Sequence, residues 1–131
     1  MGSADQSVPG RKRIVYVEDE LFFATIISRL LAEAGYAISI AEDGEKGLAL
    51  IRAERPDLVL LDLVLPKIAG KDVLRELKAD PATKDIPVVV LSNLSAEADQ
   101  REMADLGAVG FYVKATTLPS DIIEMVKERI G

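Results

Sequence analysis

Acidic, hydroxyl and basic side chains follow four short apolar runs of this chain, at the point where each run ends. The acids are Glu18, Asp19 and Asp62, and they are joined by the hydroxyl of Ser92 and the amine of Lys114. Carboxylates gathered in one place repel each other, and a hard divalent cation such as Mg²⁺ relieves that repulsion. A carboxylate beside such a cation can attack a phosphoryl group, while the metal and a lysine share the developing charge. A nearby hydroxyl could then bind a phosphate oxygen and act as a sensor of its arrival.

Each of these residues also has a purely structural interpretation. Asp19 and Ser92 could cap the N-termini of the helices that follow them, and Lys114 could be an exposed surface lysine. Their occurrence together, at the ends of separate apolar runs, favours a shared site over four independent structural roles.

Composition limits the chemistry that this chain can perform. Its 131 residues carry a formal net charge of −6, which argues against a general nucleic-acid-binding surface. Histidine and cysteine are both absent, which excludes a His-based triad, a phosphohistidine on this chain, disulfides and Cys-based metal sites. No apolar run approaches the roughly 20 residues that span a bilayer, and no signal peptide is visible, so we expect a cytoplasmic protein without membrane contact.

Strand and helix patterns alternate along the chain. The run from Leu58 to Leu61 has no period-2 alternation, which is typical of a strand buried on both faces in a parallel sheet. Similar runs predict strands over 14–17, 37–41, 86–91 and 109–113. Helical patterns follow the strands: one closed by Gly35, one between Asp43-Gly44 and Pro56, one that stops before Pro81, one over roughly Ala96 to Leu106, and one with Pro119 in its first turn.

This alternation predicts a single α/β domain, with a parallel sheet covered by helices on both faces. The carboxyl ends of parallel strands lie on one edge, so the polar residues that follow them are expected to converge there. Residues 11–131 are expected to form this domain. Residues 1–10 are small and polar and are expected to form a disordered tail, whose Met-Gly-Ser start has the composition of a cloning remnant.

Four motifs stand at the ends of the predicted strands: Val17-Glu18-Asp19-Glu20, Asp57-Leu58-Val59-Leu60-Leu61-Asp62 with Pro66 and Gly70, Pro87-Val88-Val89-Val90-Leu91-Ser92, and Gly110-Phe111-Tyr112-Val113-Lys114. With these motifs the chain resembles the receiver domain of two-component response regulators over nearly all of residues 12–130. The resemblance implies a flavodoxin-like (βα)5 fold, with a five-stranded parallel sheet in the order 2-1-3-4-5.

The resemblance implies a role for each matching residue in phosphoryl chemistry. Asp62 corresponds to the phosphoacceptor, Lys114 to the lysine that pairs with the phosphoryl group, and Ser92 to the switch hydroxyl. Phe111 stands at the aromatic switch position and is expected to turn inward when Ser92 moves toward the phosphoryl group. In relatives this change remodels the face formed by the fourth helix, the last strand and the last helix.

The resemblance also implies a Mg²⁺ (or Mn²⁺) site. Asp19 and Asp62 would bind the metal directly, Glu18 would act through water, and Val64 would supply its backbone carbonyl. The apolar side chain of Val64 is therefore no objection to this assignment.

The implied function is a phosphorylation-dependent switch in a two-component phosphorelay. The phosphoryl donor would be the phosphohistidine of a histidine kinase or of a His phosphotransfer domain. The remodelled face would control a downstream protein or an output domain that is absent from this sequence, and phosphorylation-dependent homodimerisation is a further implied partnership. Such a chain catalyses its own aspartyl phosphorylation and slow dephosphorylation, and it is not a turnover enzyme.

Three departures from the family pattern bear on this interpretation. Ala115 stands where relatives usually have a cis proline after the lysine, and Asn93 is larger than the usual residue after the switch hydroxyl. Val64 and Leu94 are apolar where relatives use polar side chains to position the hydrolytic water, which predicts slow self-dephosphorylation.

Two alternatives remain open at the level of sequence. A receiver-like module that binds partners without phosphorylation would tolerate Ala115 and Asn93. An enzyme on the same fold is disfavoured, because a haloacid-dehalogenase phosphatase needs Asp-x-Asp where this chain has Asp62-Leu63-Val64. A flavodoxin would need a first loop rich in Ser, Thr and Gly, and here that loop is acidic; nor is there a P-loop or dinucleotide motif.

Overall fold

The computed structural model describes residues 10–93 and 97–131, so most of the expected tail, together with Leu94, lies outside the described residues. Strands and helices alternate along the described chain, as predicted. They are β1 (Arg13–Val17), α2 (Leu21–Glu33), β2 (Ala37–Ala41), α3 (Gly44–Glu54), β3 (Leu58–Leu61), α4 (Gly70–Ala79), β4 (Val88–Ser92), α5 (Glu97–Asp105), β5 (Gly110–Val113), the 3-10 helix η1 (Lys114–Thr116) and α6 (Pro119–Ile130).

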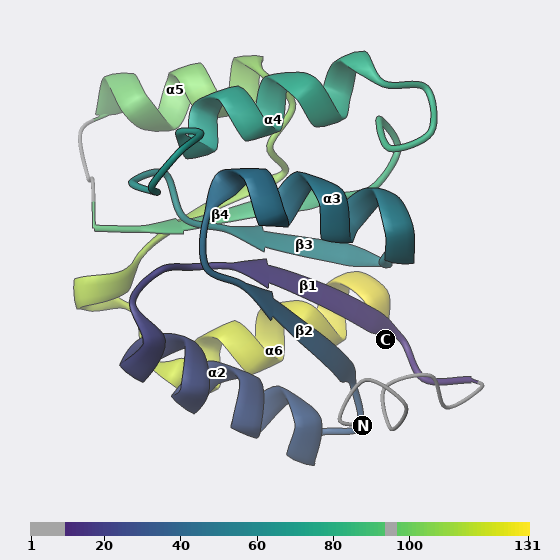
Figure 1. The fold of residues 1–131 in the computed structure, drawn as a ribbon. Helices are drawn as coiled ribbons and strands as arrows, with labels where there is room; N and C mark the ends of the chain where they lie inside the picture. Colours follow the sequence, from purple (N-terminus) through teal and green to yellow (C-terminus); the bar gives the residue numbers. More distant parts are fainter. Residues whose placement is uncertain (1–9, 94–96) are drawn as a thin grey trace.

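The five strands form one parallel sheet in the order β2-β1-β3-β4-β5. Figure 1 shows α2 and α6 on one face of the sheet and α3, α4 and α5 on the other. Both the predicted strand order and the predicted helices on both faces are confirmed. The carboxyl ends of the strands all point to the left edge of the view in Figure 1.

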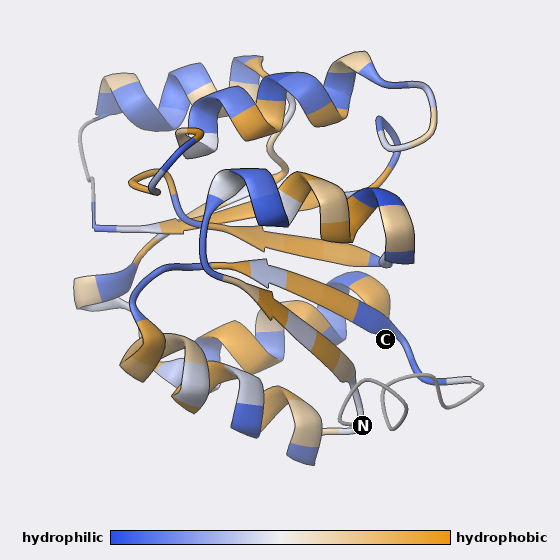
Figure 2. Ribbon diagram, in the orientation of Figure 1, coloured by the Kyte–Doolittle hydropathy of each residue, from blue (hydrophilic) through white to orange (hydrophobic). Residues whose placement is uncertain are grey.

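Two apolar clusters hold these layers together. In β1, Ile14 and Tyr16 face the cluster under α2 and α6, whereas Val15 and Val17 face the cluster under α3 and α4. This alternation follows from the period of two residues in a strand. Every residue of β3 is buried, as its unbroken apolar run predicts, and Figure 2 shows the strands as the most hydrophobic part of the ribbon. Truncating a core residue such as Leu60 to Ala should cost about 2–5 kcal/mol.

The fourth strand begins two residues later than the apolar run Ile86–Leu91 predicts. The backbone N–H of Ile86 donates to the carbonyl of Thr83 at 3.0 Å, in a turn that precedes the strand. Pro87 has no N–H to donate to the ladder, although its carbonyl accepts from Val59 N at 2.9 Å. Regular pairing therefore starts at Val88.

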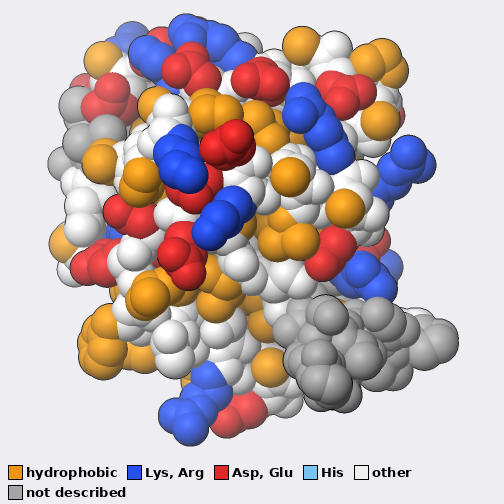
Figure 3. Space-filling view, viewed as in Figure 1, with side chains coloured by type: hydrophobic (Ala, Val, Ile, Leu, Met, Phe, Trp, Pro, Cys, Tyr) orange, Lys and Arg blue, Asp and Glu red, His pale blue; other side chains and the backbone are white. Residues whose placement is uncertain are grey.

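The outer surface carries interleaved charges. Basic and acidic side chains alternate over the face formed by α3 and α4 (Figure 3). Three ion pairs there join Arg52 to Glu76 at 3.4 Å, Lys67 to Glu45 at 3.8 Å and Lys71 to Glu102 at 3.3 Å. Such exposed pairs are each worth about 0–1 kcal/mol. Within residues 10–93 and 97–131, every helix is too short or too polar to cross a bilayer.

Candidate functional site

The polar residues singled out in the sequence meet at the carboxyl edge of the sheet. Glu18 and Asp19 follow β1, Asp62 follows β3, Ser92 is the last residue of β4, and Lys114 follows β5. Because the strands are parallel, their separate chain positions become neighbours at one edge (Figure 1). A pocket of about 470 Å³ opens at this edge and is lined by Asp19, Glu20, Asp62, Val64, Ser92 and Asn93.

Three carboxylates at this edge of the sheet are close enough to hold one cation. Glu18, Asp19 and Asp62 each offer an oxygen that lies within 4.8 Å of the oxygens from the other two. Glu18 and Asp62 are buried, whereas Asp19 is exposed to the pocket. A set of oxygen ligands around one point suits a hard divalent cation such as Mg²⁺ or Mn²⁺.

Asp19 does not serve as the helix cap that its position allowed. The N-cap of α2 is Glu20, and its side chain makes no capping hydrogen bond. The Asp19 side chain is therefore left facing the pocket, where its charge adds to those of Glu18 and Asp62.

Lys114 is buried and bridges the acidic groups, so the interpretation as a surface lysine is wrong. Its Nζ donates to both oxygens of Glu18, at 2.9 and 3.0 Å, and to Asp62 Oδ2 at 3.2 Å. A third acid, Glu20, accepts from the same Nζ at 3.2 Å. None of the peptide bonds in the described residues is cis, and Lys114 reaches Asp62 with a trans bond to Ala115.

Burial and charge together perturb the ionisable groups of the site. Burial raises the pKa of Glu18 to about 7, and the hydrogen bond from Lys114 opposes that rise. For Lys114, burial acts to lower the pKa, but the hydrogen bond to Glu18 and the charges of Asp62 and Glu18 outweigh it and raise the pKa above its ordinary value. The two pKa values are thus raised for different reasons: burial raises that of Glu18, whereas the neighbouring carboxylates raise that of Lys114.

The loop after Asp62 is packed tightly onto the start of α4. Gly70 donates its N–H to the carbonyl of Leu63 at 2.9 Å, and a Cβ on Gly70 would overlap the carbonyl oxygen of Asp62. The N–H of Val64 donates to Asp62 Oδ1 at 3.4 Å. Only glycine lets α4 approach this closely, so the start of α4 packs directly against the backbone that carries Asp62 and Val64.

Ser92 and Phe111 lie on neighbouring strands. Ser92 is buried and lines the pocket beside Asp62. Phe111 pairs in register with Val90 in β4 and is half-buried against the cluster under α3 and α4. It also lines a second hollow of about 270 Å³, which Met103 of α5 lines as well.

The contacts in the site that were not predicted from the sequence include those of Tyr16, the Glu20 side chain and Phe23. The hydroxyl of Tyr16 donates to Glu18 Oε1 at 2.9 Å, Glu20 pairs with Lys114, and the ring centroid of Phe23 lies 5.2 Å from Lys114 Nζ. One signal was available for Tyr16, because a buried tyrosine hydroxyl needs a partner and residues 16 and 18 of a strand share a face. Glu20 and Phe23 gave no such signal.

Comparison with known proteins identifies relatives of this chain. Residues 14–127 match the family model of the response regulator receiver domain. The DNA-binding dual master transcriptional regulator RpaA of Synechocystis sp. is 39% identical over 114 residues, which make up 87% of this chain and 46% of RpaA. The chain spans less than half the length of RpaA and of the probable transcriptional regulators ycf27 of Cyanophora paradoxa and Guillardia theta, which it also matches.

Solved structures of response regulators are similar to this chain in both fold and sequence. The phosphorylated cyanobacterial phytochrome response regulator RcpA has a TM-score of 0.79 at 37% identity, and the match covers 91% of each chain. The Mn²⁺-bound form of the response regulator Rcp1 has a TM-score of 0.78 at 32% identity, covering 89% of this chain and 90% of Rcp1.

Proposed function

Because this chain belongs to the response regulator receiver domain family, we propose that it is a phosphorylation-dependent signalling switch with Asp62 as its phosphoacceptor. The observation that carries this proposal is the arrangement around Asp62. Its buried carboxylate opens onto the pocket, lies 3.2 Å from Lys114 Nζ, and shares a potential cation site with Glu18 and Asp19. The phosphorylated state of RcpA, at 37% identity, supports the same chemistry here.

The three carboxylates, with the backbone carbonyl of Val64, are the groups that would hold Mg²⁺ or Mn²⁺. The bound cation would supply positive charge beside the oxygens of the transferring phosphoryl group. The fit rests on the clustered oxygens of Glu18, Asp19 and Asp62, and the Mn²⁺-bound form of Rcp1 supports it.

Asp62 acts as the nucleophile in this scheme. One carboxylate oxygen attacks phosphorus, the new O–P bond forms, and the P–N bond to the donor imidazole breaks. The electron pair of that bond leaves with the imidazole nitrogen, which then takes a proton from solvent. A phosphohistidine of a histidine kinase or of a His phosphotransfer domain would be the donor.

Lys114 and Ser92 would then respond to the new group. Lys114 already donates to Asp62, so its ammonium is in reach of phosphoryl oxygens attached there. The hydroxyl of Ser92, a residue that lines the pocket together with Asp62, would bind another phosphoryl oxygen. Movement of Ser92 would open space for Phe111, and the face formed by α5, β5 and α6 would change shape. A partner would shift the balance between the two states only by the difference in its affinity for them.

The partner bound through this face would be a downstream protein, a linked output domain or a second copy of the chain. We place the protein outside the turnover enzymes, because the two covalent steps in this scheme are its own phosphorylation and dephosphorylation. Divalent cation, donor kinase and responding partner are therefore the three ligands that the proposal requires.

Mass spectrometry tests the proposal directly. Wild-type protein mixed with Mg²⁺ and acetyl phosphate should gain the mass of one phosphoryl group, and Asp62→Asn should not. Asp57→Asn is the matched control, because Asp57 is an exposed acid at the opposite end of the same strand and should leave the gain intact. No gain in wild type would favour a phosphorylation-independent interaction module, and a gain that survives in Asp62→Asn would move the phosphoacceptor elsewhere.

A further inference from the structure

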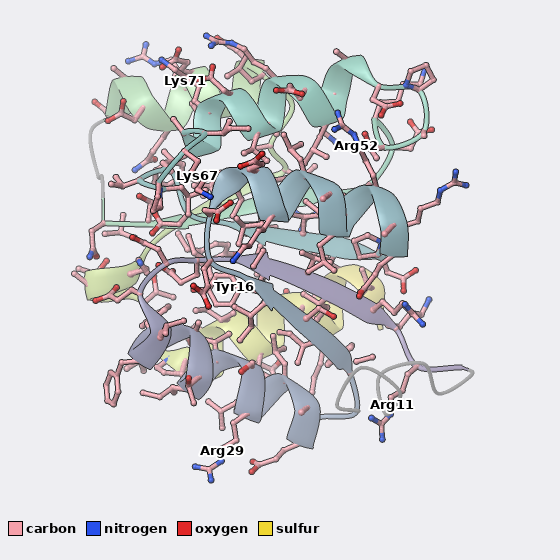
Figure 4. The ribbon with its side chains drawn as sticks, in the orientation of Figure 1. Arg11, Tyr16, Arg29, Arg52, Lys67 and Lys71 are labelled. Carbon is pink, nitrogen blue, oxygen red and sulfur yellow. The ribbon has the colours of Figure 1, made fainter. Side chains whose placement is uncertain are left out.

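Tyr16 places a phenol hydroxyl beneath the acidic site. Its side chain is fully buried on the face of β1 that packs against α2 and α6, and Figure 4 shows it pointing from β1 into that layer. Tyr16 and Glu18 are two residues apart at the end of one strand, so their side chains point to the same side. The hydroxyl donates to Glu18 Oε1 at 2.9 Å.

Glu18 is held by donors on both of its oxygens. Oε1 accepts from Tyr16 and from Lys114, whereas Oε2 accepts from the backbone N–H of Glu20 at 3.2 Å and from Lys114. Lys114 is shared, since it also donates to Asp62 and to the Glu20 side chain. The phenol has one acidic partner and sits on a ring fixed by the core, so it is the more rigid of the two side-chain donors.

We infer that Tyr16 is a positioning residue: its hydroxyl keeps the Glu18 carboxylate oriented toward a divalent cation, both while Lys114 also donates to Glu18 and after Lys114 turns to the phosphoryl group. This inference rests on the proposed function. Once Lys114 leaves, Glu18 retains one donor on each oxygen, Tyr16 on Oε1 and the Glu20 N–H on Oε2. A phenylalanine at position 16 would leave Oε1 without either of these side-chain donors, on a carboxylate that has no contact with solvent.

Groups that orient a metal-binding residue through a hydrogen bond commonly change metal affinity by 10- to 100-fold when they are removed. Tyr16→Phe deletes only the hydroxyl and leaves the ring in the core. We expect the Mn²⁺ dissociation constant, measured from the electron paramagnetic resonance signal of free Mn²⁺, to rise about tenfold. This measurement requires no phosphorylation.

Tyr36→Phe is the matched control, because Tyr36 is buried in the same apolar cluster but immediately precedes β2, at the opposite end of the strands. Its Mn²⁺ affinity should stay within about twofold of wild type, since distant sites act independently. A second measurement separates positioning from a general loss of structure. With acetyl phosphate, the Mg²⁺ concentration for half-maximal phosphorylation should rise about tenfold in Tyr16→Phe, while the rate at saturating Mg²⁺ stays within about threefold.

Equal Mn²⁺ affinity in wild type and Tyr16→Phe would overturn the inference, as would an equal loss in Tyr36→Phe. If Tyr16→Phe does not fold, as judged by circular dichroism, Tyr16→Leu removes the same hydroxyl and must show the same loss of affinity. Failure of the proposed function looks different: wild type would bind Mn²⁺ but gain no phosphoryl mass, and the comparison of Mn²⁺ affinities would still decide the role of Tyr16. Wild-type protein that binds no Mn²⁺ would remove the basis of the inference.

Discussion

Replacing Lys114 with methionine tests whether this lysine is the counter-charge of the site. Methionine is unbranched and flexible, so it can fill the volume of the lysine stem without its charge. The variant leaves the carboxylates of Glu18 and Asp62 facing each other in a buried site. We expect the metal-free variant to be less stable than the metal-free wild type.

The size of the effect follows from how deeply the bridged groups are buried. The side chains of Lys114, Glu18 and Asp62 are 6%, 0% and 7% exposed, and the amine donates three hydrogen bonds to the two acids. Removing one partner from a buried ion pair costs about 3–5 kcal/mol. The pair with Glu20 adds little, because that side chain is 60% exposed. We therefore expect a loss of about 3–5 kcal/mol in the free energy of unfolding.

Urea titration followed by circular dichroism measures this loss, in a chelator at about pH 8, above the pKa of about 7 that Glu18 has in wild type with Lys114 in place. Adding excess Mg²⁺ should then stabilise the variant more than it stabilises wild type, since the cation no longer competes with an ammonium. Tenfold tighter binding would enlarge that increment by about 1.4 kcal/mol. Lys127→Met, an exposed lysine on α6, is the control and should change stability by no more than about 0.5 kcal/mol.

Two results would refute the reasoning. A metal-free Lys114→Met protein within about 0.5 kcal/mol of wild type would mean that the carboxylates need no internal counter-charge. Equal stabilisation of variant and wild type by Mg²⁺ would mean that the lysine and the cation do not compete for the same acids.

Three further variants probe other parts of the structure. Gly70→Ala forces a Cβ into the carbonyl of Asp62, so its free energy of unfolding in urea should fall by at least about 1–3 kcal/mol and its phosphorylation should be slower. In Gly110→Ala the new Cβ meets only ordinary contacts, so this control should keep the stability and the phosphorylation rate of wild type. Val64→Asn places a polar group at the pocket, where it can make one new hydrogen bond to the attacking water, worth about 0.5–1.5 kcal/mol. Dephosphorylation should therefore become about two- to tenfold faster, and an unchanged lifetime of the phosphorylated form would contradict this. Asp43→Ala removes the N-cap of α3 and should cost about 1 kcal/mol, while Asp43→Ser should recover most of it.

The sheet could be predicted from the sequence because its strands are aliphatic runs bounded by polar residues. Leu58–Leu61 forms β3 with every residue buried, and Asp62, the acid after it, lies at the expected edge of the sheet. The start of β4 was missed by two residues, because hydrophobicity does not reveal that Ile86 is engaged in a turn. Local hydrogen bonding, which decides where a strand begins, leaves little trace in an apolar pattern.

The convergence of the site residues was predictable from topology, but their hydrogen-bond partners were not. Parallel strands bring Glu18, Asp62 and Lys114 to one edge whatever their side chains do. The bond from Lys114 to Glu18 joins residues 96 positions apart, and its existence depends on side-chain lengths and rotamers. The pattern indicated a lysine for phosphate; it did not indicate that the same lysine bridges three carboxylates.

The reach of Lys114 crosses the sheet. It follows β5, the outermost strand on its side, yet its amine contacts acids that follow β1 and β3, so the side chain passes the end of β4 on the way. The Lys114 side chain therefore links the end of β5, at the edge of the sheet, to the acids that follow its central strands. A change in the hydrogen-bond partners of Lys114 would therefore act first on β5 and η1, at the edge of the sheet where a partner protein could bind.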